Sequence, residues 1–318
     1  MRSKYRITKT LSILLMVFSV FFFLFSNHWV FLSHQRFGAL ANLQMQHLRN
    51  LENRLSDVVV VGHRGSGLES TKGDLLIGNT RSAIDVAMEA DVDWIEVDVR
   101  RTQDGHFVLF HDETLDAKTD AAGQIEAMQL KEVASVELLL PDDENRNILS
   151  LEEVLAEYQA SHPNLNWILD LKLGKTNSTG DGLAERIRQA SCFRAELPRL
   201  LDRLGITSHR ITIFGDAEII QAFSDTKFNL GYTLLFASHK DLPLSQEDVF
   251  EHAAANGHAI LVVPIVFVTA SLVENAKEKN LQVWSYDSND IRDLRYCVAC
   301  GVSGLIVDNP DADISCIR

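Results

Sequence analysis

Acidic residues are missing from the N-terminal part of the chain, although they dominate the rest. No Asp or Glu precedes Glu52, whereas the 318 residues together contain 44 acidic and 30 basic side chains. Residues 1–51 hold six of the basic ones, so residues 52–318 have 24 basic against 44 acidic side chains, a net charge of −20. Such a body repels nucleic acid. We therefore expect no nucleic-acid partner, and a local source of positive charge, such as a cation, wherever an anion binds.

Cysteine is also scarce, and several catalytic motifs are absent. The four cysteines are too few for a disulfide scaffold. Cys297 and Cys300 have C-x-x-C spacing but lack a second pair for zinc and the strand-to-helix context of a redox motif, so we interpret them as a structural pair. There is no G-x-S-x-G, P-loop or G-x-G-x-x-G context, which removes support for acyl transfer, nucleotide hydrolysis and hydride transfer.

The acid-free N-terminal part predicts a membrane anchor. Four basic residues at positions 2, 4, 6 and 9 precede a mostly apolar stretch over 11–32, which is close to the ~20 residues that span a bilayer. The basic cluster predicts a cytoplasmic N-terminus and a catalytic domain on the outer side, periplasmic or extracellular. A cleaved signal peptide is the alternative, but the A-x-A-like site at 39–41 lies far beyond the apolar run.

We therefore divide the chain into three parts. Residues 1–32 form the cytoplasmic tail and anchor, and leucines near helical spacing over 33–56 predict a juxtamembrane linker helix. Residues 57–318 form one α/β domain, in which short apolar runs alternate with amphipathic segments. The predicted strands cover 58–62, 94–99, 106–111, 167–173, 210–214, 229–235, 259–263, 281–286 and 304–308. The predicted helices cover 80–90, 151–160, 182–203, 216–224, 246–256, 270–279 and 289–299.

This alternation predicts a (β/α)₈ TIM barrel, because strands that alternate with helices form a parallel sheet with crossover helices. Nine candidate strands are one too many, and we expect 229–235 or 259–263 to lie outside the barrel. The polar span 112–150 interrupts the alternation and predicts a small insertion after the third strand, on the face where such barrels build their active sites.

Two predicted strands carry charged side chains on one face. In "DWIEVDVR", Glu96 and Asp98 alternate with apolar residues, and in "WILDLKL", Asp170 and Lys172 do the same. The apolar faces should pack against the helices, which directs the charged faces into the barrel. Buried carboxylates repel one another, and a divalent ion with oxygen ligands is the natural compensation. The alternative is that the charged face lies on an exposed edge strand. The presence of the same pattern in two strands argues against this alternative.

Histidines and cations are predicted at the same mouth. His63 and Arg64 follow the first strand, and His111 ends the third, so all should lie at carboxyl ends of strands. Two histidines beside three carboxylates, Arg64 and Lys172 indicate an acid/base pair around a metal-bound anion. Arg64 can bind phosphate oxygens as a fork, and Lys172 adds a point charge.

Seven motifs, in this order, resemble the glycerophosphodiester phosphodiesterase family. They are "HRG" at 63–65, "NT" at 79–80, "EVD" at 96–98, T-x-D-G…H-D at 102–112, "LSLEEVL" at 149–155, "DLK" at 170–172 and "GLIVDNP" at 304–310. The resemblance implies a TIM barrel with a small insertion that uses Ca²⁺ or Mg²⁺ to hydrolyse glycerophosphodiesters to glycerol 3-phosphate and an alcohol.

By motif, the resemblance implies a role for each site residue. Glu96, Asp98 and Asp170 would bind the metal, His63 and His111 would be general acid and base, Arg64 and Lys172 would hold the phosphate, and Trp284 would contact the glycerol moiety.

Two departures from the family pattern keep alternatives open. Gly78 stands where the family has Glu before "NT", so a support of the site is missing. Asp170 stands where the family has Glu, and Asp-x-Lys is similar to sphingomyelinase D-type phospholipases. A lysophospholipase D or sphingomyelinase D-like activity on membrane lipids is therefore the first alternative. A membrane-tethered binding protein on a decayed barrel is the second, and the complete set of charged site residues argues against it.

Overall fold

The computed structural model describes residues 58–67, 77–139, 146–174, 182–233, 250–251, 253, 259–286 and 288–310. The predicted anchor over 11–32 and the linker helix over 33–56 lie outside these residues, as does most of the predicted helix over 246–256. Within the part of the chain that is described, no helix combines the length and apolar character needed to cross a membrane.

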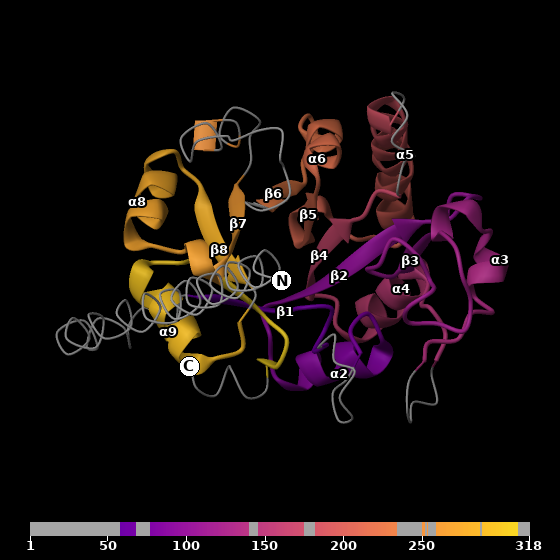
Figure 1. Ribbon diagram of the computed structural model, residues 1–318, viewed down its shortest axis with the longest axis horizontal. Coiled ribbons are helices and arrows are strands. Elements are labelled where there is room, and N and C mark those ends of the chain that lie inside the picture. Colours follow the sequence, from indigo (N-terminus) through magenta and orange to yellow (C-terminus); the bar gives the residue numbers. More distant parts are fainter. Residues whose placement is uncertain are drawn as a thin grey trace, which may run out of the picture. The chain divides into compact units, whose positions relative to one another are not determined.

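Eight parallel strands close into a barrel, as the alternating sequence pattern predicts (Figure 1). Each strand pairs with the next around the ring, and β1 returns to pair with β2 through Val61 and Trp94. The barrel strands are β1 (Val59–Gly62), β2 (Trp94–Arg101), β4 (Asn166–Leu171), β5 (Ile211–Gly215), β6 (Asn229–Thr233), β7 (Ile260–Pro264), β8 (Gln282–Tyr286) and β9 (Gly304–Val307).

The ninth strand is not the one that the sequence suggested. Both 229–235 and 259–263 contribute barrel strands, so that expectation was wrong. The extra strand is β3 (Phe107–Leu109), which runs antiparallel to the far end of β2, with Val99 opposite Leu109. A tight turn at residues 102–106 reverses the chain, and Gly105 adopts a φ of +88° in it. The insertion therefore follows the second barrel strand and its hairpin, not a third barrel strand.

Helices follow the barrel strands and cover the outside of the sheet (Figure 1). Two of them begin after threonines, Thr80 and Thr269, whose hydroxyl groups accept a backbone N–H. The α-helices are α2 (Arg81–Glu89), α3 (Leu130–Val133), α4 (Leu151–Ser161), α5 (Gly182–Arg203), α6 (Ala217–Phe223), α8 (Ala270–Glu278) and α9 (Ile291–Cys300). The described ranges also contain three short 3₁₀ helices, η1 (Ile125–Ala127), η2 (Ser208–Arg210) and η3 (Ile265–Phe267).

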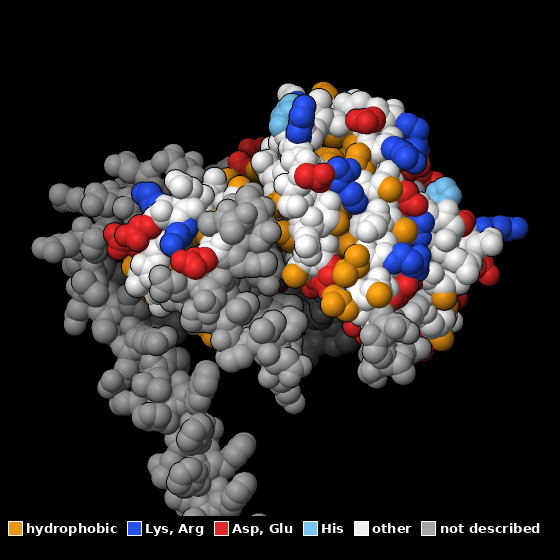
Figure 2. All heavy atoms as spheres, turned by 90° about the horizontal axis from the view of Figure 1, so that it is seen from above, with side chains coloured by type: hydrophobic (Ala, Val, Ile, Leu, Met, Phe, Trp, Pro, Cys, Tyr) orange, Lys and Arg blue, Asp and Glu red, His pale blue; other side chains and the backbone are white. Residues whose placement is uncertain are grey.

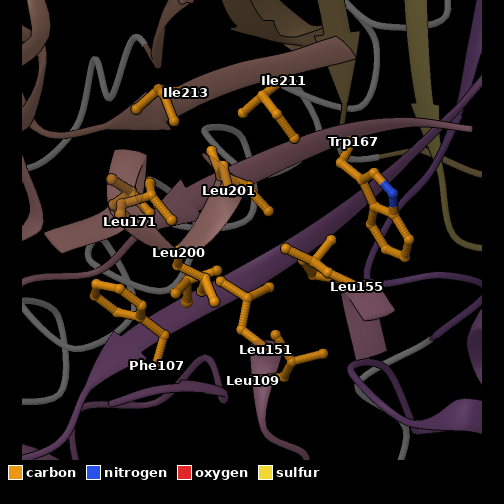
Figure 3. Packing of buried hydrophobic residues seen from close by; sticks show 14 of the residues in the cluster. Phe107, Leu109, Leu151, Leu155, Trp167, Leu171, Leu200, Leu201, Ile211 and Ile213 are labelled. Carbon is orange, nitrogen blue, oxygen red and sulfur yellow. The ribbon is translucent and has the colours of Figure 1, made fainter. Parts of the chain in front are cut away.

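The two faces of the barrel strands carry different side chains. Outward residues such as Ile95, Val97 and Leu169 join a cluster with the helices, part of which Figure 3 shows around Trp167 and Leu155. Inward residues form a second cluster inside the barrel, with Val61, Ile168, Phe214, Ile260, Val262, Trp284 and Ile306. Since the apolar faces of β2 and β4 point outward, their charged faces point into the barrel, as we inferred from the alternation.

The insertion has a core of its own and is fixed to the barrel by an ion pair. Val108, Leu115, Ile125 and other apolar residues pack together in it. Arg100, only 2% exposed at the end of β2, donates one N–H to Glu126 Oε1 at 2.8 Å and another to the carbonyl oxygen of His111 at 2.8 Å. This buried pair fixes the start of the insertion against the mouth of the barrel.

Candidate active site

A cavity of about 940 Å³ opens at the carboxyl ends of the barrel strands. One side of its wall is charged and comes from β1, β2, β4 and the insertion, and the other side includes Phe214, Val262, Tyr286 and Ile306 from β5, β7, β8 and β9. The charged residues predicted from the sequence all line it. They are His63, Arg64, Glu96, Asp98, His111, Asp170 and Lys172.

Three carboxylates meet at the charged side of the cavity. Asp98 on β2 lies directly opposite Asp170 on β4 in the sheet register, and Glu96 lies two residues below Asp98 on the same face. One oxygen from each carboxylate lies within 4.8 Å of the others, an arrangement that can hold a metal ion. Burial and the charge of Asp98 raise the pKa of Glu96 to about 7. Burial and neighbouring negative charge thus both oppose ionisation of Glu96.

Two cations lie against these carboxylates. Lys172 Nζ is 2.6 Å from Asp170 Oδ2 and 3.1 Å from Asp98 Oδ1, and Arg64 Nε is 2.9 Å from Asp98 Oδ2. Burial opposes ionisation of Asp98, but Lys172 and Arg64 outweigh it and hold the pKa of Asp98 well below its usual value. Burial likewise lowers the pKa of Lys172, yet Asp170 and Asp98 raise it overall, so the lysine is charged.

Each of the two histidines is held by an aspartate. His63 Nδ1 lies 2.5 Å from Asp308 Oδ1, and His111 Nδ1 lies 2.8 Å from Asp112 Oδ1. A carboxylate can only accept, so in each pair Nδ1 carries the hydrogen and Nε2 is the atom that can exchange a proton. His63 Nε2 lies 3.9 Å from Glu96 Oε2, which places it beside the carboxylate cluster.

The surroundings shift the two histidines in opposite directions. Burial lowers the pKa of His63, but the bond to Asp308 and the charge of Glu96 outweigh burial, and the pKa is raised. Burial, Arg64 and Lys172 lower the pKa of His111, against the opposing charge of Asp98. Two titratable groups driven apart in this way are typical of an acid and base pair.

His111 reaches the site by a route that the sequence did not indicate. We expected it at the carboxyl end of a parallel strand, but β3 runs in the opposite direction. Because β2 extends beyond the mouth and β3 folds back along it, Phe110 N donates to Asp98 O at 3.1 Å. His111 follows Phe110 and therefore enters the mouth from above.

A comparison with known protein families matches the part of the chain that contains these site residues. Residues 63–312 match the Glycerophosphoryl diester phosphodiesterase family. The chain belongs to this family. It is therefore an enzyme, a phosphoric diester hydrolase, as the motifs implied, and the match begins at His63 and continues past Asp308.

Individual proteins are similar to the chain at low sequence identity, and the solved structures among them share its fold. A glycerophosphodiester phosphodiesterase of Caldanaerobacter subterraneus subsp. tengcongensis is 24% identical over 267 residues, which are 82% of this chain and 98% of that protein. A phosphodiesterase of Oleispira antarctica, solved in complex with the product sn-glycerol-3-phosphate, has a TM-score of 0.66 at 21% identity and covers 83% of this chain and 98% of its own. A glycerophosphodiester phosphodiesterase from Agrobacterium tumefaciens has a TM-score of 0.61 at 21% identity, over 81% and 99% of the two chains.

The departure from the family pattern at Gly78 has a structural consequence. A Cβ atom at this position would lie 2.5 Å from Cβ of Arg64 and 2.9 Å from its Cδ, so the Arg64 side chain passes directly over the glycine. The next residue, Asn79, has a φ of +64° and bonds to Asp98 twice, at the carboxylate and at the backbone N–H. Arg64 thus occupies space that a side chain at 78 would need.

One predicted site residue does not reach the cavity. Trp284 is 2% exposed, lies inside the barrel in edge contact with Trp94 and Phe214, and is not part of the cavity wall. Its place in the cavity wall is taken by Tyr286, two residues further along β8 and on the same face. The structure therefore does not support contact between Trp284 and a substrate in this cavity.

Several side chains of the site were not singled out from the sequence. Asp308, Asp112 and Asn79 each orient a predicted site residue, and Arg100 with Glu126 holds the backbone of His111. The first three belong to motifs that carried the family resemblance, "GLIVDNP", "HD" and "NT", so a signal was present. Glu126 lies within the polar insertion, where the sequence shows no such signal.

Asp308→Asn should lower the pKa of His63 in the metal-free protein, because a neutral amide stabilises the imidazolium less than a carboxylate does. Because the pKa of His63 is higher in the folded protein than in the unfolded protein, where it is about 6.5, protonation of His63 stabilises the fold. This stabilisation is complete below about pH 6.5 and is lost as the pH rises through the pKa of the folded protein. The variant should therefore lose stability at pH 5.5 and little at pH 8.5. NMR titration of the His63 ring and urea unfolding at both pH values measure this, with the exposed Asp202→Asn as control. An unchanged His63 titration in Asp308→Asn would contradict the assignment.

Proposed function

We propose that this enzyme is a metal-dependent phosphodiesterase that hydrolyses glycerophosphodiesters to glycerol 3-phosphate and an alcohol, with His63 and His111 as general acid and base. The observation that carries the proposal is the convergence of both Asp-held histidines, three carboxylates and two cations on one cavity. Family membership supports the substrate class, and so does the glycerol 3-phosphate bound to the Oleispira antarctica relative.

The three carboxylates fit a divalent ion. Glu96, Asp98 and Asp170 offer hard oxygen ligands, which Ca²⁺ and Mg²⁺ prefer. The raised pKa of Glu96 indicates that the cluster without an ion does not keep all of its negative charge at neutral pH. A divalent ion held there would neutralise the phosphate and the charge that grows on it during attack.

The protein's own residues account for binding and proton transfer. Arg64 and Lys172 border the carboxylates and present positive charge where the phosphate oxygens of a bound diester would lie. One histidine takes a proton from the attacking oxygen, which belongs either to water or to the 2-hydroxyl of the substrate. Attack by the 2-hydroxyl gives a cyclic phosphodiester, which water must then open to form glycerol 3-phosphate. The other histidine protonates the alcohol oxygen as its bond to phosphorus breaks. Asp308 and Asp112 hold both rings so that Nε2 exchanges the proton.

His63→Ala and His111→Ala should each lower kcat for glycerophosphocholine by a factor of ~10² or more, because each removes one proton transfer. Both should fold normally, since the rings are only partly buried. Release of glycerol 3-phosphate measures turnover, and thermal unfolding checks the fold. His106→Ala, an exposed histidine in the turn before β3, is the matched control. Near-wild-type turnover of either site variant would refute the assignment.

Ca²⁺ or Mg²⁺ should stabilise the protein, by about 2.7 kcal/mol at a concentration of one hundred times Kd. Asp170→Asn should weaken this effect, whereas Asp216→Asn, at the cavity wall but outside the carboxylate cluster, should leave it intact. Thermal unfolding with each ion gives both results without an activity assay. EDTA should abolish turnover. Full activity after exhaustive chelation, or equal metal stabilisation in both variants, would rule out the proposed metal site.

We also propose that residues 11–32 anchor the protein in a membrane, with the N-terminus in the cytoplasm and the barrel on the outer side. The length of the apolar run and the basic residues before it support this proposal. The full chain should remain in the membrane pellet after extraction at alkaline pH. A soluble product whose mass corresponds to a chain that begins after the A-x-A-like site at 39–41 would show a cleaved signal peptide instead.

A further inference from the structure

Exposed hydrophobic side chains have an uneven distribution on the molecule. Among the residues that the structure describes, five large hydrophobic side chains are exposed, and they come from three separate segments. They are Leu139, Leu183, Ile187, Val266 and Phe267, with exposed fractions from 40% to 67%. Single exposed hydrophobic residues are ordinary on a protein surface, so their common location carries the argument.

All five lie at the mouth end of the barrel, and we call them the apolar rim. Leu183 and Ile187 flank Arg186, a residue of the cavity wall, in the first turns of α5. Val266 and Phe267 lie in η3, which begins directly after the carboxyl end of β7. These four residues therefore lie on two loops at the mouth, one after β4 and one after β7, which are separated by β5 and β6 in the barrel.

Leu139 lies in the insertion, which is also at the mouth end of the barrel. Its backbone N–H donates to Lys118 O at 2.9 Å, and Lys118 Nζ lies 3.1 Å from Asp112, the partner of His111. The opposite end of the barrel, where the helices end and the strands begin, has no large exposed hydrophobic residue in the described ranges. The apolar rim thus marks the face that contains the active site.

The nature of the rim favours a lipid surface over a protein partner. Its residues are interspersed with charged side chains such as Arg186 and Arg188. On the face of the molecule that Figure 2 shows, the described hydrophobic side chains also lie between basic and acidic ones. Dispersed apolar side chains can enter the boundary between lipid headgroups and acyl chains, a soft region that requires no matching shape. A protein interface would instead bury a contiguous apolar centre.

The charge of the chain restricts the kind of lipid. Residues 52–318 carry a net charge of −20, so anionic headgroups would repel the body of the protein. A zwitterionic surface does not. The apolar run over 11–32 of the same chain, which we propose as an anchor, would keep the barrel within reach of such a surface. With the phosphate at the charged side of the cavity, Phe214 and Ile306 on the other side would face the acyl chain that lies beyond the glycerol of a lipid.

We propose that the apolar rim docks the mouth of the barrel on a zwitterionic lipid surface and that the cavity takes a phosphodiester carried by a lipid in that surface. The docking is argued from the rim and from the charge of the chain and requires no catalysis, whereas the cleavage of a lipid-borne diester rests on the proposed hydrolytic function. The experiment below separates the two, because its first measurement requires no catalysis.

The first measurement is quenching of a new tryptophan by lipid. Phe267→Trp in the rim and Glu278→Trp at the opposite end of α8 are made in the full chain, which is reconstituted in phosphatidylcholine vesicles with brominated acyl chains. The native tryptophans contribute equally in both variants. We expect bromolipid to quench Phe267→Trp more strongly than the wild type and to leave Glu278→Trp at the wild-type level. Equal quenching of both variants would overturn the docking proposal.

The second measurement compares a soluble with a vesicle-borne substrate. The combined variant Leu183→Gln, Ile187→Gln, Val266→Gln and Phe267→Gln should keep wild-type turnover of glycerophosphocholine and lose about tenfold on lysophosphatidylcholine in phosphatidylcholine vesicles. Wild-type turnover by this variant on the vesicles would overturn the proposal. Should the variant not fold, Val266→Gln with Phe267→Gln alone is tested in the same way.

Other occupants of the rim give different results. If a second copy of the chain covers the rim, bromolipid does not quench the tryptophan of the Phe267→Trp variant. The protein then migrates as a dimer, and the rim substitutions dissociate it. This result would overturn lipid docking. If no diester of any kind is hydrolysed, the proposed function fails, while the quenching comparison still decides the docking.

Discussion

The mouth of this barrel depends on a buried negative charge at Asp98. Its carboxylate is 1% exposed and is contacted by Lys172, Arg64 and Asn79, which come from three different segments. A buried charge that loses a partner destabilises a protein strongly, so each contact constrains the loop that supplies it. Asp98 therefore fixes the loop after β1, the segment before α2 and the end of β4 in a single arrangement, and the site is built around that arrangement.

The architecture was readable from the sequence because burial in a barrel strand has a period of two. In both β2 and β4 the apolar residues alternate with charged ones, and the helices can accept only the apolar face, so the direction of the charged face follows. This argument needs no knowledge of neighbouring strands. For this reason the sequence alone assigns the carboxylates of β2 and β4, and Lys172 beside them, to one mouth.

Strand direction was not readable in the same way, and β3 shows why. "FVLF" has the composition of a barrel strand, and composition does not distinguish a parallel from an antiparallel neighbour. The available signal was the connection: five residues separate β2 from β3, whereas a parallel crossover requires about a dozen or more. The same limit applies to depth. Trp284 and Tyr286 share one face of β8, and only the register with β7 and β9 decides that the first is buried and the second reaches the cavity.

The two histidines of the site have different structural origins, which explains why one is harder to predict. His63 is positioned by the barrel itself, since Asp308 directly follows β9, the neighbour of β1. His111 is positioned by the insertion, through Asp112 and Lys118 and through the bond from Arg100 to its carbonyl oxygen. Its location depends on the packing of the insertion, and the Arg100–Glu126 ion pair couples that packing to β2. The position of His63 thus depends on the barrel, and the position of His111 depends on the insertion. A change in the insertion can therefore alter catalysis without changing the carboxylate cluster.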